Sequence, residues 1–208
     1  MRLIRPWFFA AYFLPAACFR IKTTEKVLCL TFDDGPDPDS TLPLLNIIEK
    51  FNIRAVFFCS GNSAMKYPEI VLKIKSGGHI IGNHCFNHLD GFKTSTKRYI
   101  ENVMAADPFT SDKLFRPPYG RLRPLQYRKL TKTYKIIMWD LLAYDFDKSL
   151  GKEKSMNIMK KKIRKGSIIV FHDKPDSTVH EFLEEFIIYC LSQGYRFDLP
   201  AFLHEPAD

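Results

Sequence analysis

The sequence has few of the features typical of disulfide-bonded or nucleic-acid-binding proteins. Its five cysteines are odd in number, widely spaced and without a Cys-x-x-Cys pair, which indicates free thiols rather than a disulfide framework or a zinc finger. Low-complexity linkers and nucleic-acid module patterns are absent, although a net charge of +8 favours anionic partners. A reducing compartment fits free thiols best. We therefore favour a cytoplasmic or membrane-associated location, with export as the alternative.

The first 22 residues form an apolar segment. Two arginines precede 13 mostly apolar residues at 7–19, a run too short to span a bilayer. Three interpretations stay open: an uncleaved leader that covers the bottom of the fold, a peripheral membrane anchor, and an export signal. We expect two parts, a leader or anchor at 1–22 and one globular domain at 23–208.

Apolar strand-like runs alternate with helix-like segments from residue 26 onward. Strands are expected at 26–32, 55–59, 79–82, 113–115, 134–139, 167–171 and 195–198. Helices are expected at 40–51, 68–78, 94–105, 124–132, 154–166 and 179–194. This alternation predicts an α/β fold with about seven strand–helix units and parallel strands. An open doubly wound sheet and a (β/α) barrel both satisfy it.

Reactive side chains gather at or just after the carboxyl ends of the predicted strands. They are Asp33, Asp34, His84, Arg116, Asp145 and His172. A (β/α) barrel carries its active site at this end, whereas an open sheet binds ligands mainly at one switch point. Contributions from five strand ends converge more naturally in a barrel, and we therefore favour the barrel.

Two motifs offer groups that could bind a cation. Asp33 and Asp34 are adjacent like charges at a strand end, before a Gly-Pro turn, so either a cation compensates them or they lie in a solvated turn. His84 and His88 are spaced i, i+4 and would share one face of a helical turn, where they could chelate a single cation. His79, on the preceding strand, is expected to be a packed, hydrogen-bonded residue.

Two further motifs offer rigid or titratable groups. The prolines of RPPYG, residues 116–120, fix the backbone and present Arg116 and the Tyr119 main chain in a set geometry. His172 directly follows a buried strand, where its neighbours can tune it near physiological pH.

Taken together, the motifs resemble the polysaccharide deacetylases of carbohydrate esterase family four. TFDDGP, H-x-x-x-H, RPPYG, the Asp145–Phe146 pair and VFH at 170–172 occur in this order, and the resemblance covers roughly residues 24–198. It implies a deformed (β/α) barrel of about seven units, with 23–208 as the catalytic domain. It also implies a hydrolase of linear amides, which removes acetyl groups from an amino-sugar oligomer or polymer such as peptidoglycan or chitin.

The resemblance further implies one divalent metal ion. Asp34, His84 and His88 would bind it. Two imidazoles and a carboxylate suit zinc first, with cobalt, nickel and manganese as alternatives.

The remaining motif residues would move protons or contact the substrate. By the same resemblance, Asp33 would be the general base and Arg116 would orient it. His172 would be the general acid, and Asp145 would tune it. Three residues would contact the substrate: Tyr119, whose backbone N–H would help hold the oxyanion, Phe146 and Trp139.

Two departures from the family pattern bear on substrate fit rather than on activity. Cys85 stands where Ser or Thr is common, and Phe146 where Trp is common. The alternatives are an O-acetyl esterase on acetylated polysaccharide, an amidase on a small cyclic amide, and a non-catalytic basic polysaccharide-binding protein. The expected partner is an acetylated amino-sugar oligomer or polymer and not nucleic acid. We also expect a monomer with peripheral membrane contact through residues 1–22.

Overall fold

The protein folds around a curled sheet of parallel strands. We describe it from a computed structural model, which covers residues 4–6, 10–110 and 112–200. The strands are β1 (Val27–Asp33), β2 (Val56–Cys59), β3 (Ile80–Asn83), β4 (Leu114–Phe115), β5 (Lys135–Ile136), β6 (Leu141–Leu142), β7 (Ile168–His172) and β8 (Arg196–Phe197). Their order is β5-β4-β3-β2-β1-β7-β6, and β8 pairs with β1. This half-barrel confirms the predicted deformed (β/α) barrel.

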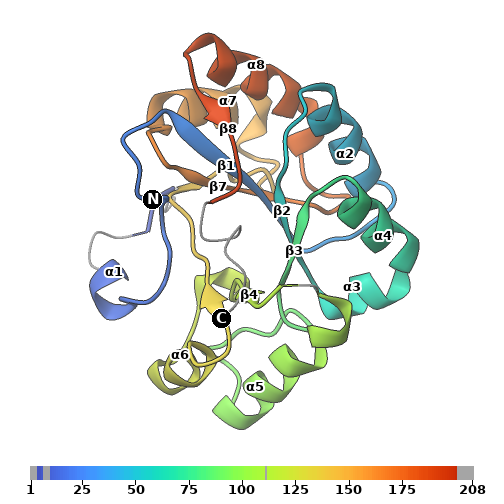
Figure 1. The fold of residues 1–208 in the computed structure, drawn as a ribbon, viewed down its shortest axis with the longest axis vertical. Coiled ribbons are helices and arrows are strands. Elements are labelled where there is room, and N and C mark those ends of the chain that lie inside the picture. The colour runs from blue at the N-terminus through green and yellow to red at the C-terminus, as the bar shows by residue number, and fades with distance from the viewer. Residues whose placement is uncertain (1–3, 7–9, 111, 201–208) are drawn as a thin grey trace.

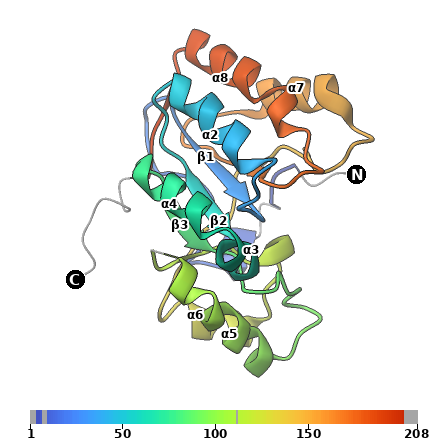
Figure 2. The same cartoon turned by 90° about the vertical axis from the view of Figure 1, so that its right-hand side faces the viewer.

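Helices cover the outside of the sheet, and the short helix α1 of the N-terminal segment stands apart from them (Figures 1 and 2). They are α1 (Ala10–Phe13), α2 (Thr41–Lys50), α3 (Gly61–Lys66), α4 (Pro68–Ser76), α5 (Thr96–Ala105), α6 (Pro124–Leu130), α7 (Gly151–Lys162) and α8 (Leu183–Ser192). Six overlap the predicted helices, with ends that differ by up to four residues. The sequence pattern missed α3, because GNSAMK is short and lacks an apolar stripe. It also missed β6, which the structure separates from β5.

Phenylalanine rings fill the layer between the central strands and the helices that cover them. Phe32 stacks on Phe57 and Phe171, with ring centroids 4.9 and 5.9 Å apart, and all three rings are buried. Full burial of such a ring contributes about 1.5–3 kcal/mol to stability. These rings therefore give the strand ends a rigid base.

The N-terminal segment bridges the two end strands of the half-barrel. The Leu142 N–H donates to the Ile4 carbonyl (2.9 Å), which occupies the β6 edge. The Cys18 N–H donates to the Ile136 carbonyl, and the Met138 N–H donates to the Cys18 carbonyl (both 2.8 Å), which occupies the β5 edge. Backbone groups near residues 4 and 18 thus satisfy edges that would otherwise be open.

The division of the chain at residue 22 stays a prediction. Residues 1–3 and 7–9 of the apolar segment lie outside the described residues. Within the described ranges, no helix has the length and apolarity needed to cross a bilayer.

Candidate active site

Asp33 and His172 lie close together because β1 and β7 pair side by side in the sheet. Asp33 lies opposite His172 in this pairing, so both side chains leave the sheet on the same face. Asp34 follows with a positive φ of 86°, a conformation that non-glycine residues rarely adopt. This turn lets two successive carboxylates serve one cavity although strand alternation would separate them.

Arg116 holds Asp33 from inside the barrel. Its guanidinium is fully buried, and Nη1 donates to Asp33 Oδ1 and to Thr31 Oγ1, each at 2.6 Å. Nε and Nη2 donate to the backbone carbonyls of Ile137 (3.2 Å) and Met138 (3.0 Å). The guanidinium also lies over the ring of Phe58 on β2. One Asp33 oxygen is therefore fixed by charge-assisted hydrogen bonds, which are stronger than neutral ones.

Three ligand-type atoms converge beside Asp33. Asp34 Oδ1 is buried, and no donor among the described residues hydrogen-bonds to it. The Nε2 atoms of His84 and His88 lie 3.5 and 3.1 Å from this oxygen. His84 Nδ1 lies 2.7 Å from the Arg116 carbonyl, which fixes the proton on Nδ1 and leaves a lone pair on Nε2. A lone pair facing a carboxylate oxygen calls for a cation between them, so these residues fit a divalent metal.

The neighbouring imidazoles favour the charged form of Asp34. Burial alone would raise the pKa of Asp34, but the contacts with His84 and His88 lower this pKa well below its usual range. The Asp34 carboxylate is therefore favoured in its ionised form, which is the form that can bind a cation.

Asp145 holds His172 on the other side of the cavity. Its Oδ1 lies 2.9 Å from His172 Nδ1, and its Oδ2 accepts from the His172 N–H (2.6 Å) and from the Ser177 hydroxyl (2.6 Å). Burial opposes protonation of His172, but the carboxylates of Asp145, then Asp34 and Asp33, raise the pKa of His172 overall. The ring therefore keeps its proton to higher pH than a free histidine.

The expectation that His84 and His88 share a helical turn is wrong. They lie on an irregular loop after β3, where Cys85 and His88 have positive φ values of 63° and 50°. The Asn83 side chain accepts the Cys85 N–H at 2.8 Å, which supports this turn. The two imidazoles still come together, with ring centroids 5.0 Å apart.

Positive φ values recur around the cavity. Besides Asp34 and the two loop residues, Tyr119 (59°) and Tyr144 (58°) adopt them. Such strain persists only where the surrounding structure imposes it, and it concentrates at functional sites.

A cavity of about 360 Å³ joins these groups. Eight of the ten predicted site residues line it: Asp33, Asp34, His84, His88, Tyr119, Trp139, Phe146 and His172. Arg116 and Asp145 are buried behind this lining, against the side chains that they orient. The Phe146 ring packs against His172 at 4.7 Å, and the Tyr119 ring against His88 at 4.8 Å. The cavity thus has aromatic walls on both sides of the ionisable groups.

Three residues near the site escaped the sequence analysis. Lys174 lines the cavity, with Nζ 3.4 Å from Asp34 Oδ2. Asp173 is buried and accepts hydrogen bonds from the hydroxyls of Ser40 (2.9 Å) and Thr41 (2.7 Å), and burial raises its pKa to about 7. Ser177 anchors Asp145. The one feature of the sequence that could have indicated these three residues is that they follow His172 within a few positions, in the loop after β7. His79, by contrast, is packed as predicted: its Nδ1 accepts the Ala55 N–H, and burial lowers its pKa to about 4.

A parallel half-barrel with an Asp-His-His cluster at its carboxyl end defines a class of candidate hydrolases. The polysaccharide deacetylase family model matches residues 20–136, more than half of the chain. The chain belongs to this family, as its motifs predicted.

Curated relatives and a solved structure give the same result. A peptidoglycan-N-acetylglucosamine deacetylase of Bacillus cereus is 29% identical over 82% of this chain and 65% of its own length. The peptidoglycan-N-acetylmuramic acid deacetylase PdaC of Bacillus subtilis is 27% identical over 85% of this chain and 38% of its own length. The chain thus spans less than two thirds of either relative. A crystal structure of the Bc1960 peptidoglycan N-acetylglucosamine deacetylase superimposes with a TM-score of 0.84 and 29% identity, over 89% of this chain and 92% of the other.

Proposed function

We propose that this protein is a metal-dependent hydrolase that removes N-acetyl groups from an amino-sugar polymer or oligomer, of the peptidoglycan or chitin type. The observation that carries the proposal is the convergence of Asp34, His84 and His88 beside Asp33 and His172 in one cavity. Ligand-type atoms of the first three lie within 4.8 Å of one another. The similarity to peptidoglycan deacetylases supports an amino-sugar substrate.

The cluster would hold one divalent metal, with zinc proposed first and cobalt, nickel or manganese as alternatives. When bound, the metal would supply Lewis-acid polarisation of the acetyl carbonyl and lower the pKa of a coordinated water. The open side of the Asp34, His84 and His88 cluster faces the cavity, where substrate and water would meet it.

Asp33 is the base in this proposal. Its Oδ1 is held by Arg116, so the other oxygen is left to take a proton from the attacking water. The water oxygen bonds to the acetyl carbon, and the backbone N–H of Tyr119 helps to hold the oxyanion.

His172 is the acid in this proposal. Its Nδ1 faces Asp145, so the proton on Nε2 is the one available to the departing nitrogen. An amine leaves readily only when protonated. Transfer of that proton lets the carbon–nitrogen bond break and gives a free amino sugar and acetate.

Acetate release is the direct test. Peptidoglycan, chitin oligomers and acetylated xylan would each be incubated with the protein, with and without a chelator. We expect release from an N-acetylated polymer, loss with chelator and recovery with added zinc. Release from xylan alone would favour the O-acetyl esterase, and release from none of the three would favour the small-amide amidase or the non-catalytic binding protein.

The metal ligands have their own test. His88→Ala should lose stoichiometric metal after purification, measured by elemental analysis, because it removes one of three ligands. His180→Ala is the matched control, since His180 is exposed outside the cavity. Full metal content in His88→Ala contradicts the ligand assignment. The monomeric state, membrane association and the native metal stay proposals.

A further inference from the structure

The N-terminal segment carries an exposed aromatic pair that neither the fold nor the proposed reaction uses. Tyr12 and Phe13 end α1, with 81% and 72% of their surface exposed, and their rings meet edge to face at 5.6 Å. In Figure 1, α1 stands at the edge of the molecule, apart from the helices that cover the sheet. Two adjacent large aromatic side chains left this exposed indicate a contact outside the chain.

Cationic side chains lie beside α1. Arg5 and Arg164 line a cavity of about 160 Å³ together with Ala11 of α1. The guanidinium of Arg5 donates to the Lys162 carbonyl, and that of Arg20 donates to the Lys165 carbonyl at 3.4 Å. These contacts draw the basic end of α7 and the loop after it toward α1.

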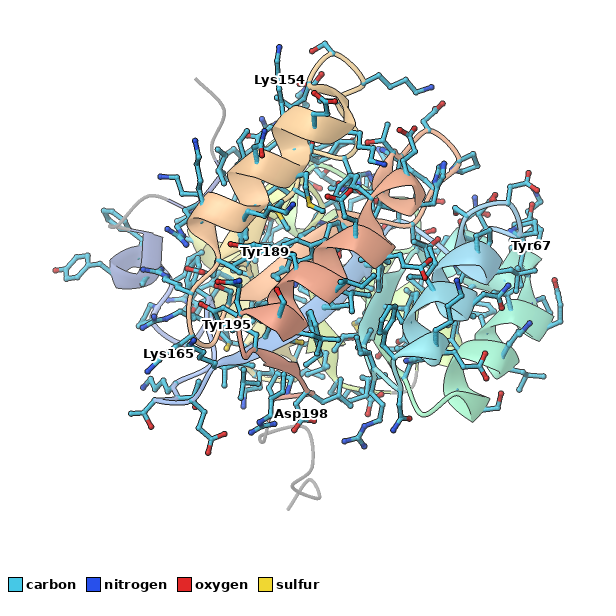
Figure 3. All side chains as sticks on the ribbon, turned by 90° about the horizontal axis from the view of Figure 1, so that it is seen from above. Tyr67, Lys154, Lys165, Tyr189, Tyr195 and Asp198 are labelled. Atoms are coloured by element: carbon cyan, nitrogen blue, oxygen red, sulfur yellow. The ribbon has the colours of Figure 1, made fainter. Side chains whose placement is uncertain are left out.

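We define the α1 surface by these aromatic and basic residues: Tyr12, Phe13, Arg5, Arg20, Lys161, Lys162, Arg164 and Lys165. Among the residues that the structure describes, the carboxylate that pairs with these cations is Asp140, which is buried and bound by Arg5 and Arg164. Figure 3 shows Lys165 on the side of the molecule that carries α1, while Lys154 lies at the far end of α7. The exposed charge of the α1 surface is therefore positive.

We propose that the α1 surface docks on an anionic lipid bilayer, with Tyr12 and Phe13 inserted at the interface and the basic residues over the headgroups. Aromatic rings with one polar end partition to this interface, and each Lys or Arg near an anionic surface adds to the attraction. Aromatic insertion alone or basic charge alone gives only weak binding, whereas the two together give stable anchoring. The hydrogen bonds of residues 4, 18 and 20 to the barrel hold α1 in place for this contact.

The test is co-sedimentation with vesicles of phosphatidylglycerol and phosphatidylcholine, compared with vesicles of phosphatidylcholine alone. We expect wild-type binding to the anionic vesicles that weakens with salt. Tyr12→Ser/Phe13→Ser should lose at least about tenfold in affinity, since one aromatic side chain is worth about 1.5–3 kcal/mol when buried. Lys161→Gln/Lys162→Gln/Lys165→Gln should lose on the order of 100-fold, at about 1 kcal/mol per cation.

Matched control variants distinguish binding through this surface from non-specific binding to vesicles. Leu72→Ser removes a side chain that is 67% exposed on α4, and Lys152→Gln/Lys154→Gln removes exposed cations at the other end of α7. Both should bind vesicles as the wild type does. The proposal is overturned if the wild type does not bind anionic vesicles, or if a control variant loses as much affinity as the test variants. It is also overturned if Tyr12→Ser/Phe13→Ser changes only the oligomeric state in gel filtration. Acetate release plays no part in the readout, so this outcome is independent of the proposed function.

Discussion

Replacement of Asp145 by Asn tests the acid side of the proposed reaction. Asn keeps the size of the side chain but removes the charge that faces His172. In the wild type, Asp145 Oδ2 accepts from both the His172 N–H and the Ser177 hydroxyl. An Asn NH₂ group at this position would face these two donors. If the amide flips to avoid this clash, the contact with His172 Nδ1 becomes donor to donor instead.

The size of the effect follows from the lost hydrogen bond. A hydrogen bond to a charged group is worth about 1.5–3 kcal/mol, and one pKa unit corresponds to about 1.36 kcal/mol. The pKa of His172 should therefore fall by about 1–2 units. Because the protonated ring is the acid, the alkaline limb of kcat/KM should move to lower pH by the same amount.

Stability should change with pH in the same sense. The folded-state pKa of His172 is raised, so its contribution to stability is complete below the unfolded value of about 6.5 and is lost as pH rises through the folded pKa. The difference in unfolding free energy between wild type and Asp145→Asn, measured without metal, should be larger at about pH 5 than at about pH 9.

The assay is the pH profile of acetate release by the metal-loaded protein, with urea unfolding of the metal-free protein beside it. Asp176→Asn is the control, since Asp176 lies in the loop after β7, has 82% of its side chain exposed and pairs with Lys148. If a folded Asp145→Asn protein with full metal content keeps the alkaline limb unchanged, the prediction is refuted. His172 would then not be an acid whose pKa Asp145 raises.

Three other variants probe the opposite side of the cavity. Asp33→Asn should keep its metal, by elemental analysis, and lose about 10²–10⁴-fold in turnover, the usual worth of a general base; near-wild-type turnover excludes Asp33 as the base. Lys174→Met should tighten metal binding by up to about fivefold in chelator competition, because it removes a half-exposed cation from Asp34 worth up to about 1 kcal/mol; weaker binding would mean that the lysine instead orients the ligand. Gly35→Ala should lower the free energy of unfolding by about 1–3 kcal/mol, because its Cβ would lie 2.2 Å from Asp173 Oδ2; an unchanged melting temperature would contradict this close packing.

The long strands and the strand-end carboxylates could be predicted because local pattern suffices for them. The stretches that became β1, β2 and β7 are continuous apolar runs, and in a parallel barrel their carboxyl ends must meet at one rim. The two-residue strands β4, β5, β6 and β8 leave too little pattern for exact bounds, since pairing with neighbours defines them.

The loop that carries the two histidines shows where local pattern fails. The i, i+4 spacing suggested a helical turn, but the backbone of Cys85 and His88 is left-handed and the Asn83 side chain supports that geometry. Lys174 and Ser177 were missed for a different reason. Their partners, Asp34 and Asp145, lie more than 30 positions away in sequence, and only the folded chain brings them together.

The position of the N-terminal segment has a consequence for the order in which the protein folds. The backbone around residues 4 and 18 bonds to strands near 136–142, on the order of 100 residues later, so during synthesis it must wait for its partners. The sheet from β1 to β3 can assemble meanwhile from contacts that are closer in sequence. Closure of the barrel is then a late event, and the backbone around residues 4 and 18 is among the last parts to reach its place.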